Sequence, residues 1–325
     1  MHFEEIYNMS QKIKKNVQKV IVGKGEVIDL MLIAIISSGH ILLEDVPGTG
    51  KTLLAKSMAS SIDSNFKRIQ FTPDLLPSDL TGINYFNQKH SEFQFREGPI
   101  FTNILLADEI NRATPRTQSS LLESMEERQA TIDGETMQID SPFMVIATQN
   151  PIETQGTFPL PEAQLDRFLI KIDMGYPTTN EGIEILTRFK DDNPLDILKP
   201  VVSREDVIRA QNSYSKVFVS DDVLEYIVRI GEASRKHAEV ILGISPRGTQ
   251  ALLKTASVYA ILQGRDYVLP DDVKAMCPPV LSHRLMLRRA THIGRDYIKS
   301  VLNEIIKDVP VPSEEGLIKD EVDNE

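Results

Sequence analysis

The first half of the chain alternates short apolar runs with stretches of helical periodicity. Apolar runs bounded by polar or turn-forming residues predict buried strands; they cover 41–44, 68–71, 103–107, 143–148 and 168–172. Apolar residues spaced three or four apart predict helices; these cover 3–20, 27–36, 51–61 and 118–127. Strands that alternate with helices in this way predict an α/β fold, in which a five-stranded parallel sheet is covered by helices on both faces.

The pattern changes after Pro177, where the strand-like runs end. From about residue 180 to 308 the spacing predicts helices only, and these cover 180–188, 203–214, 221–236, 246–263, 270–277 and 295–306. We therefore expect a second, all-helical domain. The predicted division is a core at 1–178, a linker with the first lid helix at 179–200, a helical lid domain at 201–310 and an acidic mobile tail at 311–325.

Two hairpins are expected to interrupt the α/β pattern. Alternating apolar and polar residues around 85–86 and 93–95 predict a hairpin within 80–97. A second hairpin is predicted within 129–140, because Asp133-Gly134 lies between two alternating runs and Asp-Gly is a strong turn signal.

Composition narrows the class of protein. Hydrophobic residues at 41% and charged residues at 26% are typical of a globular protein. The net charge of −11 disfavours a sequence-blind nucleic-acid binder, which needs a basic face. Cys277 is the only cysteine, so no disulfide can form within the chain, which fits a reduced compartment. No apolar run approaches the length of a membrane span, and Glu4 and Glu5 precede any apolar run; we therefore expect no transmembrane segment, no signal peptide and a cytoplasmic protein.

The strand at 41–44 leads into a glycine-rich turn that opens directly into the helix at 51–61. The residues expected to bind a nucleotide there are Asp45, Val46, Pro47, Gly48, Thr49, Gly50, Lys51, Thr52 and Leu53. They match the second half of the phosphate-binding P-loop, where backbone N–H groups surround the phosphates and the helix directs its positive end toward them. Lys51 is expected to reach the β- and γ-phosphates of ATP, and the Thr52 hydroxyl to ligate Mg²⁺.

Asp45 departs from the general P-loop pattern, which has a glycine at this position. A carboxylate directed at a triphosphate would repel it, so we expect Asp45 to point away. An ordinary strand-to-helix turn is the alternative reading. The match of Gly48 to Thr52, with a strand before it and a helix after it, favours the phosphate site.

Polar residues follow two later strands. Asp108 and Glu109 end the run 103–107, at the carboxyl end of a buried strand, where α/β sheets bind their ligands. Asp108 is expected to hold the Mg²⁺ shell, and Glu109 to polarise the attacking water. Asn150 follows the strand 143–148, where its neutral amide can contact both the γ-phosphate and the water. Without a P-loop upstream, Asp108 and Glu109 would be interpreted as solvated acids after an edge strand, and Asn150 as a turn-forming residue before proline.

Two arginines are candidates for stabilising charge on the γ-phosphate. Arg167 precedes the last predicted strand, and Arg247 opens a helix of the predicted second domain. Guanidinium groups suit this task. For any single arginine a surface salt bridge is the better explanation, so both assignments depend on the family resemblance that follows.

The order and wording of these motifs resemble an AAA+ ATPase of the MoxR family. The segments that carry the resemblance are 44–52, 71–79, 98–101, 107–113, 147–151 and 160–168. The family also has Asp in place of the first P-loop glycine, so Asp45 supports the assignment. The resemblance extends from about residue 15 to 305.

The resemblance implies a role for each candidate residue. Lys51 and Thr52 would belong to Walker A, and Asp108 and Glu109 to Walker B. The remaining implied roles are sensor 1 for Asn150, an arginine finger offered to a neighbouring subunit for Arg167, and sensor 2 for Arg247. Residues 80–97 resemble the helix-2 insertion, and residues 129–140 resemble the hairpin before sensor 1. Arg112 and Arg116 are weaker candidates for the subunit boundary.

The function implied is an ATPase that binds ATP and Mg²⁺ at a subunit interface of a hexameric ring and remodels partner proteins. Proteins with a von Willebrand factor A domain are one partner class that the resemblance suggests. Two alternatives remain open: a DNA-linked AAA+ motor or transcription activator, and a nucleotide-controlled scaffold with negligible turnover. Two features expected of the DNA-linked alternative are missing from the sequence. There is no basic stripe, and residues 80–97 do not resemble the Gly-Ala-Phe-Thr-Gly-Ala loop of the activators. A small-molecule P-loop kinase is disfavoured, since it would leave the helical domain without a role.

Overall fold

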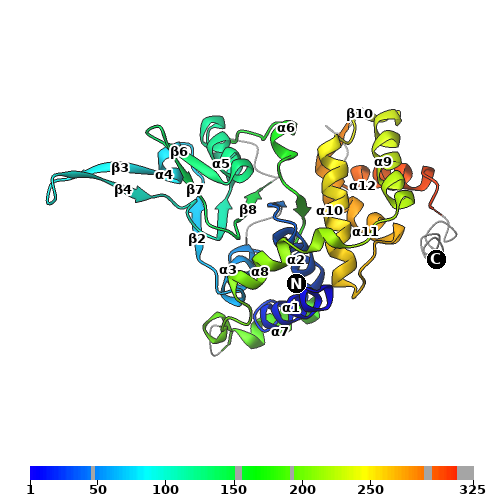
Figure 1. Cartoon of the computed structure of the whole chain (residues 1–325), viewed down its shortest axis with the longest axis horizontal. Helices are drawn as coiled ribbons and strands as arrows, with labels where there is room; N and C mark the ends of the chain where they lie inside the picture. Colours follow the sequence, from blue (N-terminus) through cyan, green and yellow to red (C-terminus); the bar gives the residue numbers. More distant parts are fainter. Residues whose placement is uncertain (45–47, 151–155, 191–193, 289–294, 313–325) are drawn as a thin grey trace, which may run out of the picture. The chain divides into compact units, whose positions relative to one another are not determined.

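The computed structural model describes residues 1–44, 48–150, 156–190, 194–288 and 295–312 (Figure 1). The chain groups into two compact units, one of Met9–Arg209 and one that joins Met1–Asn8 to Ala210–Glu325. The helix expected to open the lid, α7 (Thr179–Arg188), falls in the first unit. The domain boundary after residue 178 stays a prediction.

The first unit is built on a five-stranded parallel sheet in the order β2-β5-β8-β1-β9. The strands are β1 Ile41–Glu44, β2 Phe66–Gln70, β5 Ile104–Asp108, β8 Met144–Gln149 and β9 Ile170–Ile172. This confirms the predicted parallel sheet, with strand ends shifted by one or two residues. Because every strand runs the same way, the carboxyl ends of β1, β2, β5 and β8 meet at one edge.

Alternate residues of each strand point to opposite faces of the sheet, and the central strands are buried along almost their whole length, so helices pack on both faces. On one face, Leu105 and Val145 pack with Leu121 and Met125 of α5. On the other face, α3 contacts β5 and α2 contacts β9. The helices of this part of the chain are α1 Phe3–Val17, α2 Gly25–Ile36, α3 Lys51–Ser61, α4 Pro77–Thr81, α5 Pro115–Glu127, α6 Glu162–Leu165, α7 and α8 Arg204–Gln211, with 3₁₀ turns at Ile110–Arg112 and Pro194–Ile197.

Two antiparallel hairpins leave the sheet, as the sequence predicted. One pairs β3 (Gly82–Asn87) with β4 (Glu92–Glu97), and the other pairs β6 (Gln129–Ile132) with β7 (Glu135–Gln138). The Asp133-Gly134 turn has φ of 51° and 88°, the left-handed conformation that this dipeptide tolerates. Figure 1 shows the β3–β4 ribbon extending away from the sheet of its unit.

The second unit is mainly helical. Its elements are α9 Asp221–Lys236, α10 Pro246–Leu262, α11 Pro270–Leu281, α12 Arg295–Asp308 and 3₁₀ turns at Tyr214–Lys216 and Ser282–Arg284. The expectation of helices only is wrong here, because β10 (Val240–Leu242) pairs antiparallel with β11 (Met286–Leu287). Two runs this short carry no periodicity by which the sequence could separate strand from helix.

Helix α11 is longer than predicted. The sequence placed its end at Cys277, since Pro278 and Pro279 follow, yet the helix continues to Leu281. Prolines lack an N–H but keep a carbonyl acceptor. The Pro278 carbonyl accepts hydrogen bonds from the backbone N–H of Ser282 and from its hydroxyl, so the last turn closes around the prolines.

Candidate nucleotide site

A cavity of about 450 Å³ opens at the carboxyl ends of β2, β5 and β8. All of its lining residues belong to the first unit. Those that the sequence predicted are Gly48, Gly50, Lys51, Thr52, Leu53, Asp108, Glu109 and Asn150. Three more were not predicted, namely Arg68, Gln70 and Thr148. The fold thus brings the glycine-rich turn and the ends of two further strands into one cavity.

The glycines of the turn leave room for a bound group. Gly48 and Gly50 have φ of +85° and +89°, in the left-handed region that favours glycine. A Cβ added at either position would meet no atom within 4 Å, so it would fill open space. Helix α3 begins at Lys51, and its first N–H groups lack partners within the helix. Open space, the backbone N–H groups of a helix N-terminus and a lysine fit a phosphate group.

Three predicted site residues, Asp45, Val46 and Pro47, lie outside the described residues, and so does the expected orientation of Asp45. Thr49 is described but does not line the cavity.

The Asp108 carboxylate is held from two sides. Its Oδ1 accepts a 2.6 Å hydrogen bond from the Thr148 hydroxyl of β8. Its Oδ2 accepts hydrogen bonds from Nη2 and Nε of Arg68 on β2, at 2.7 and 3.2 Å. The Asp108 side chain is 16% exposed. The two partners fix the direction of a carboxylate whose oxygens are of the type that holds a cation.

Glu109 follows Asp108 in the left-handed conformation, with φ of 57°. Such a backbone is uncommon outside glycine and persists only where its surroundings hold it. The Glu109 N–H donates a 2.8 Å hydrogen bond to the Thr148 hydroxyl. The side-chain Oε2 accepts a hydrogen bond from Nε2 of Gln70 at 2.7 Å and forms an ion pair with Nε of Arg112 at 2.8 Å. Arg112 therefore contacts Glu109 of its own chain, and its role at a subunit boundary stays a prediction.

Thr148 connects the two acids. Its hydroxyl donates to the Asp108 carboxylate and accepts from the Glu109 N–H, so one side chain fixes both. The strand register places Gln70 opposite Asp108, which brings the polar end of β2 to the same edge. The alternation of Arg68 and Gln70 in β2 was the only sequence signal for these residues, since side chains at i and i+2 share one face.

A second polar group holds the neighbouring strand ends together. Glu44 at the end of β1 accepts a 2.7 Å hydrogen bond from Nε2 of Gln149 and forms an ion pair with Lys171 of β9. Glu44 is buried, and these partners compensate its charge. They fix the strand from which the glycine-rich turn departs.

Within the first unit, the predicted arginines Arg116 and Arg167 do not line this cavity in their own chain. Arg167 lies with Nε 3.9 Å from the Glu126 carboxylate and is about one-third exposed. Arg247 is exposed at the start of α10 in the second unit, and Arg116 is exposed on α5. Their catalytic or interface roles stay predictions.

The residues of the cavity fit Mg²⁺. Thr52 supplies a hydroxyl and Asp108 a carboxylate, and oxygen is the ligand type that Mg²⁺ prefers. Mg²⁺ usually takes one or two protein ligands and completes its shell with phosphates and water. In the described part of the chain, no group of three or more His, Cys, Asp or Glu side chains is placed to hold a metal ion.

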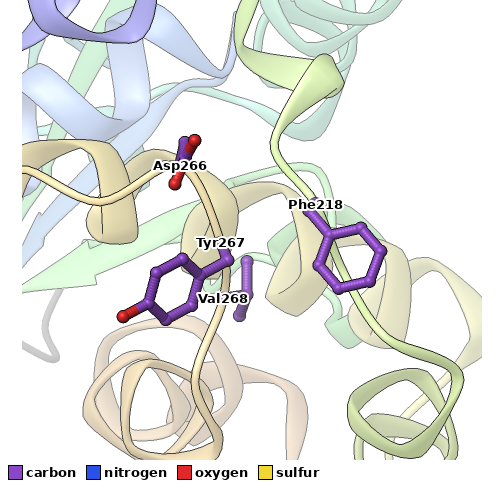
Figure 2. A pocket seen from close by; sticks show the side chains of 4 residues that line it. All are labelled: Phe218, Asp266, Tyr267 and Val268. Atoms are coloured by element: carbon purple, nitrogen blue, oxygen red, sulfur yellow. The ribbon is translucent and has the colours of Figure 1, made fainter. Parts of the chain in front are cut away.

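The second unit has a hollow of its own, of about 340 Å³, lined by Phe218, Asp266, Tyr267 and Val268. Figure 2 shows the rings of Phe218 and Tyr267 on the two sides of Val268. The lining is largely apolar and contains neither a lysine nor an arginine. A triphosphate requires cations or backbone donors, so the cavity at Lys51 is the candidate nucleotide site.

Comparisons with known proteins agree with this geometry. The family model described as "ATPase family associated with various cellular activities (AAA)" matches residues 40–170, and the AAA lid domain model matches residues 232–305. Chaperone MoxR1 of Mycobacterium tuberculosis is 41% identical, over 95% of this chain and 83% of its own length. The chain belongs to the MoxR family of AAA+ ATPases.

This MoxR-family chain is similar to two further proteins over nearly its whole length. YeaC of Bacillus subtilis strain 168 is 48% identical, over 97% of this chain and 99% of its own length. A crystal structure of a protein of Cytophaga hutchinsonii superposes with a TM-score of 0.88 at 38% identity, and the match covers 95% of this chain and 96% of that one. The predicted family and the predicted AAA+ core with a helical lid are therefore confirmed. Across the described residues, no helix combines the length and apolarity needed to cross a membrane.

Proposed function

We propose that this chain binds ATP with Mg²⁺ in the cavity at Lys51, hydrolyses it, and uses the hydrolysis to remodel or assemble partner proteins. The observation that carries the proposal is one juxtaposition. The open glycine cradle of Gly48 and Gly50 lies in the same cavity as the carboxylates of Asp108 and Glu109, each of which is held by hydrogen bonds. Membership of an ATPase family supports it.

Each side chain has a task that its position permits. Lys51 balances charge on the β- and γ-phosphates, and Thr52 and Asp108 hold Mg²⁺, which when bound neutralises charge that develops during phosphoryl transfer. Glu109 accepts a proton from the attacking water. Asn150 donates from its neutral amide to the γ-phosphate and orients the water.

We also propose that two arginines complete the site. Arg167 does not line the cavity of its own chain, so a neighbouring copy would supply it. An arginine finger provided in this way contributes about 10³–10⁵ in rate. Head-to-tail contacts of this kind close into a ring when the rotation permits, and we propose a hexamer. Arg247 is proposed to sense the γ-phosphate from the lid.

The remodelling activity rests on relatives. The Mycobacterium tuberculosis protein is named a chaperone, and we propose a chaperone-like role for this chain, with proteins carrying a von Willebrand factor A domain as the first partner class to test.

Binding of labelled ATP in the presence of Mg²⁺ tests the proposal. Wild-type protein should bind it, and a Lys51→Ala variant should bind much more weakly, because it loses the cation that faces the phosphates. A Lys56→Ala variant, which changes an exposed lysine on the same helix, is the matched control and should bind like wild type. Equal binding by all three proteins would exclude the cavity as the ATP site.

Two measurements separate the alternatives. Phosphate release near zero in a protein that binds ATP would favour the nucleotide-controlled scaffold. Stimulation of hydrolysis by added DNA would favour the DNA-linked motor, which the net charge of −11 disfavours.

A further inference from the structure

The β3–β4 hairpin carries aromatic side chains that the described residues leave exposed. Phe93 is 74% exposed and Phe86 is 51% exposed, and the two rings meet edge to face with centroids 5.4 Å apart. They lie directly opposite each other in the strand register. Ile83 and Tyr85 are also exposed, on the other face of the ribbon. A group of exposed apolar side chains on one element is typical of a protein–protein interaction site.

The base of the same hairpin is firmly held. Phe95 packs edge to face against Phe101, with centroids 5.7 Å apart, and both rings pack against the hydrophobic core of the first unit. The Asn84 amide donates a 2.8 Å hydrogen bond to Asp133 of the second hairpin. At Gly98 an added Cβ would lie 2.0 Å from the Leu80 carbonyl oxygen, so the backbones meet closely there. The base of the hairpin is therefore anchored, and its exposed end extends away from the sheet (Figure 1). This is the arrangement expected of an element that contacts a partner protein.

The ribbon also offers backbone groups for pairing. Among the described residues, β3 and β4 pair only with each other, so each strand has one outer edge without a partner strand. An isolated two-stranded hairpin is marginal in water, and an open strand edge accepts an added strand from another chain. The occupant that matches such an edge is an extended polypeptide.

Charge argues against nucleic acid at this surface. Residues 82–97 contain Lys89 and Arg96 against Glu92 and Glu97, which gives no net formal charge. Single-stranded nucleic acids bind where aromatic stacking is combined with a positively charged groove. The hairpin has the aromatic rings but no positively charged groove beside them. We therefore expect its ligand to be an uncharged, apolar segment.

We propose that the exposed end of the β3–β4 hairpin, centred on Phe86 and Phe93, docks an extended apolar segment of a partner protein. The segment lies along a strand edge, and its apolar side chains cover the two rings. This inference deepens the proposed function, because it names the class of client segment that a remodelling ATPase of this kind would contact.

Fluorescence anisotropy of the full-length protein tests the docking without nucleotide. The probe is a short fluorescein-labelled peptide of alternating threonine and aliphatic or aromatic residues, compared with a version in which serine replaces every apolar residue. The test variant is Phe86→Thr with Phe93→Thr, because threonine removes the rings and keeps strand propensity. The matched control is Leu186→Thr, which removes a side chain that is 75% exposed on α7.

Wild type and the Leu186→Thr protein should bind the apolar peptide alike, and the double variant should bind about tenfold or more weakly. Wild type should bind the serine peptide at least tenfold more weakly by the same reasoning. Unchanged binding by the double variant, no binding of the apolar peptide by wild type, or binding of a labelled oligothymidine in its place would each overturn the proposal.

A second measurement tests the docking without depending on the double variant, whose hairpin could fail to form. Benzoylphenylalanine placed at Phe93 should cross-link to the apolar peptide on illumination, and the same group at Leu186 should not. Equal cross-linking from both positions would overturn the proposal. Phosphate release is recorded separately with wild type and the double variant. A failure of ATP hydrolysis therefore stays distinguishable from a failure of peptide docking.

Discussion

The side-chain amide of Gln70 donates a 2.7 Å hydrogen bond to the carboxylate of Glu109. Gln70 ends β2, and Glu109 follows β5, the adjacent strand. In this arrangement the carboxylate is directed to Gln70 and to Arg112. Both contacts are made by Oε2 and hold the carboxylate toward Gln70 and Arg112, and we expect Glu109 to turn from Gln70 when it accepts a proton from a water beside the γ-phosphate.

Removing the Gln70 amide should therefore raise basal ATP hydrolysis. A hydrogen bond to a charged group contributes about 1.5–3 kcal/mol, so Gln70→Ala should increase kcat by about tenfold or more, with little change in ATP affinity. Phosphate release at saturating MgATP measures this effect. Gln94→Ala, a glutamine change on the β3–β4 hairpin outside the cavity, is the control. A lower kcat in Gln70→Ala would show instead that the amide positions Glu109 for catalysis.

Thr148 should matter as much as the acids that it connects. Thr148→Val keeps the shape and removes both the donor to Asp108 and the acceptor for the Glu109 N–H. Each buried partner left unsatisfied costs about 1–3 kcal/mol, so kcat should fall by about tenfold or more. Thr148→Ser retains the hydroxyl and should stay near wild type. If the valine variant turns over ATP at the wild-type rate, the bridge has no role in catalysis.

The neighbour's arginine is tested by mixing two inactive proteins. Arg167→Ala should bind ATP and fail to hydrolyse it, since the residue does not line the cavity of its own chain. Lys51→Ala protein carries an intact Arg167 and should restore phosphate release when both variants enter one oligomer. Capture of the untagged Lys51→Ala protein through an affinity tag on the Arg167→Ala protein shows whether mixed oligomers form. Mixed oligomers without any recovery would exclude action across subunits.

Cys277 should be unreactive in the folded protein. Burial raises the pKa of its thiol from 9.0 to about 12, because the thiolate cannot be solvated there. The protonated thiol is therefore favoured in the folded state, and the stability that it contributes is present below pH 9 and lost as the pH rises toward 12. At pH 8 Ellman's reagent should label no thiol in the folded protein and one thiol per chain in denaturant, since Cys277 is the only cysteine. Rapid labelling without denaturant would contradict its burial.

The second unit contains a buried ion pair whose loss should destabilise it. Asp272 is 3% exposed and accepts hydrogen bonds from Nη1 and Nη2 of Arg265 at 2.7 and 2.5 Å. Removing one member of such a pair leaves a buried charge uncompensated, so Asp272→Asn should lower the free energy of unfolding by about 3–5 kcal/mol. Asp271→Asn breaks the pair with Lys274, in which Asp271 is 83% exposed, and should change it by less than about 1 kcal/mol. Denaturant unfolding followed by circular dichroism compares the two; equal effects would refute the argument.

The sequence predicted those parts of the site that depend on local pattern. The glycine turn before Lys51 and the acids at the end of β5 are written in consecutive residues, so motif and strand pattern were sufficient. Thr148 and Gln70 escaped prediction because their roles depend on which strands lie side by side. The order β2-β5-β8 is a property of the whole sheet, and no local signal encodes it.

Phosphate release from MgATP by the Glu109→Gln variant, with ATP binding measured in parallel, tests the central claim most directly. The substitution removes the proton acceptor and leaves Lys51 and the glycine cradle unchanged. We predict ATP affinity close to that of wild type and turnover reduced by about 10²–10⁴, the usual contribution of a general base. Wild-type turnover in this variant would contradict the account, because hydrolysis would then proceed without Glu109.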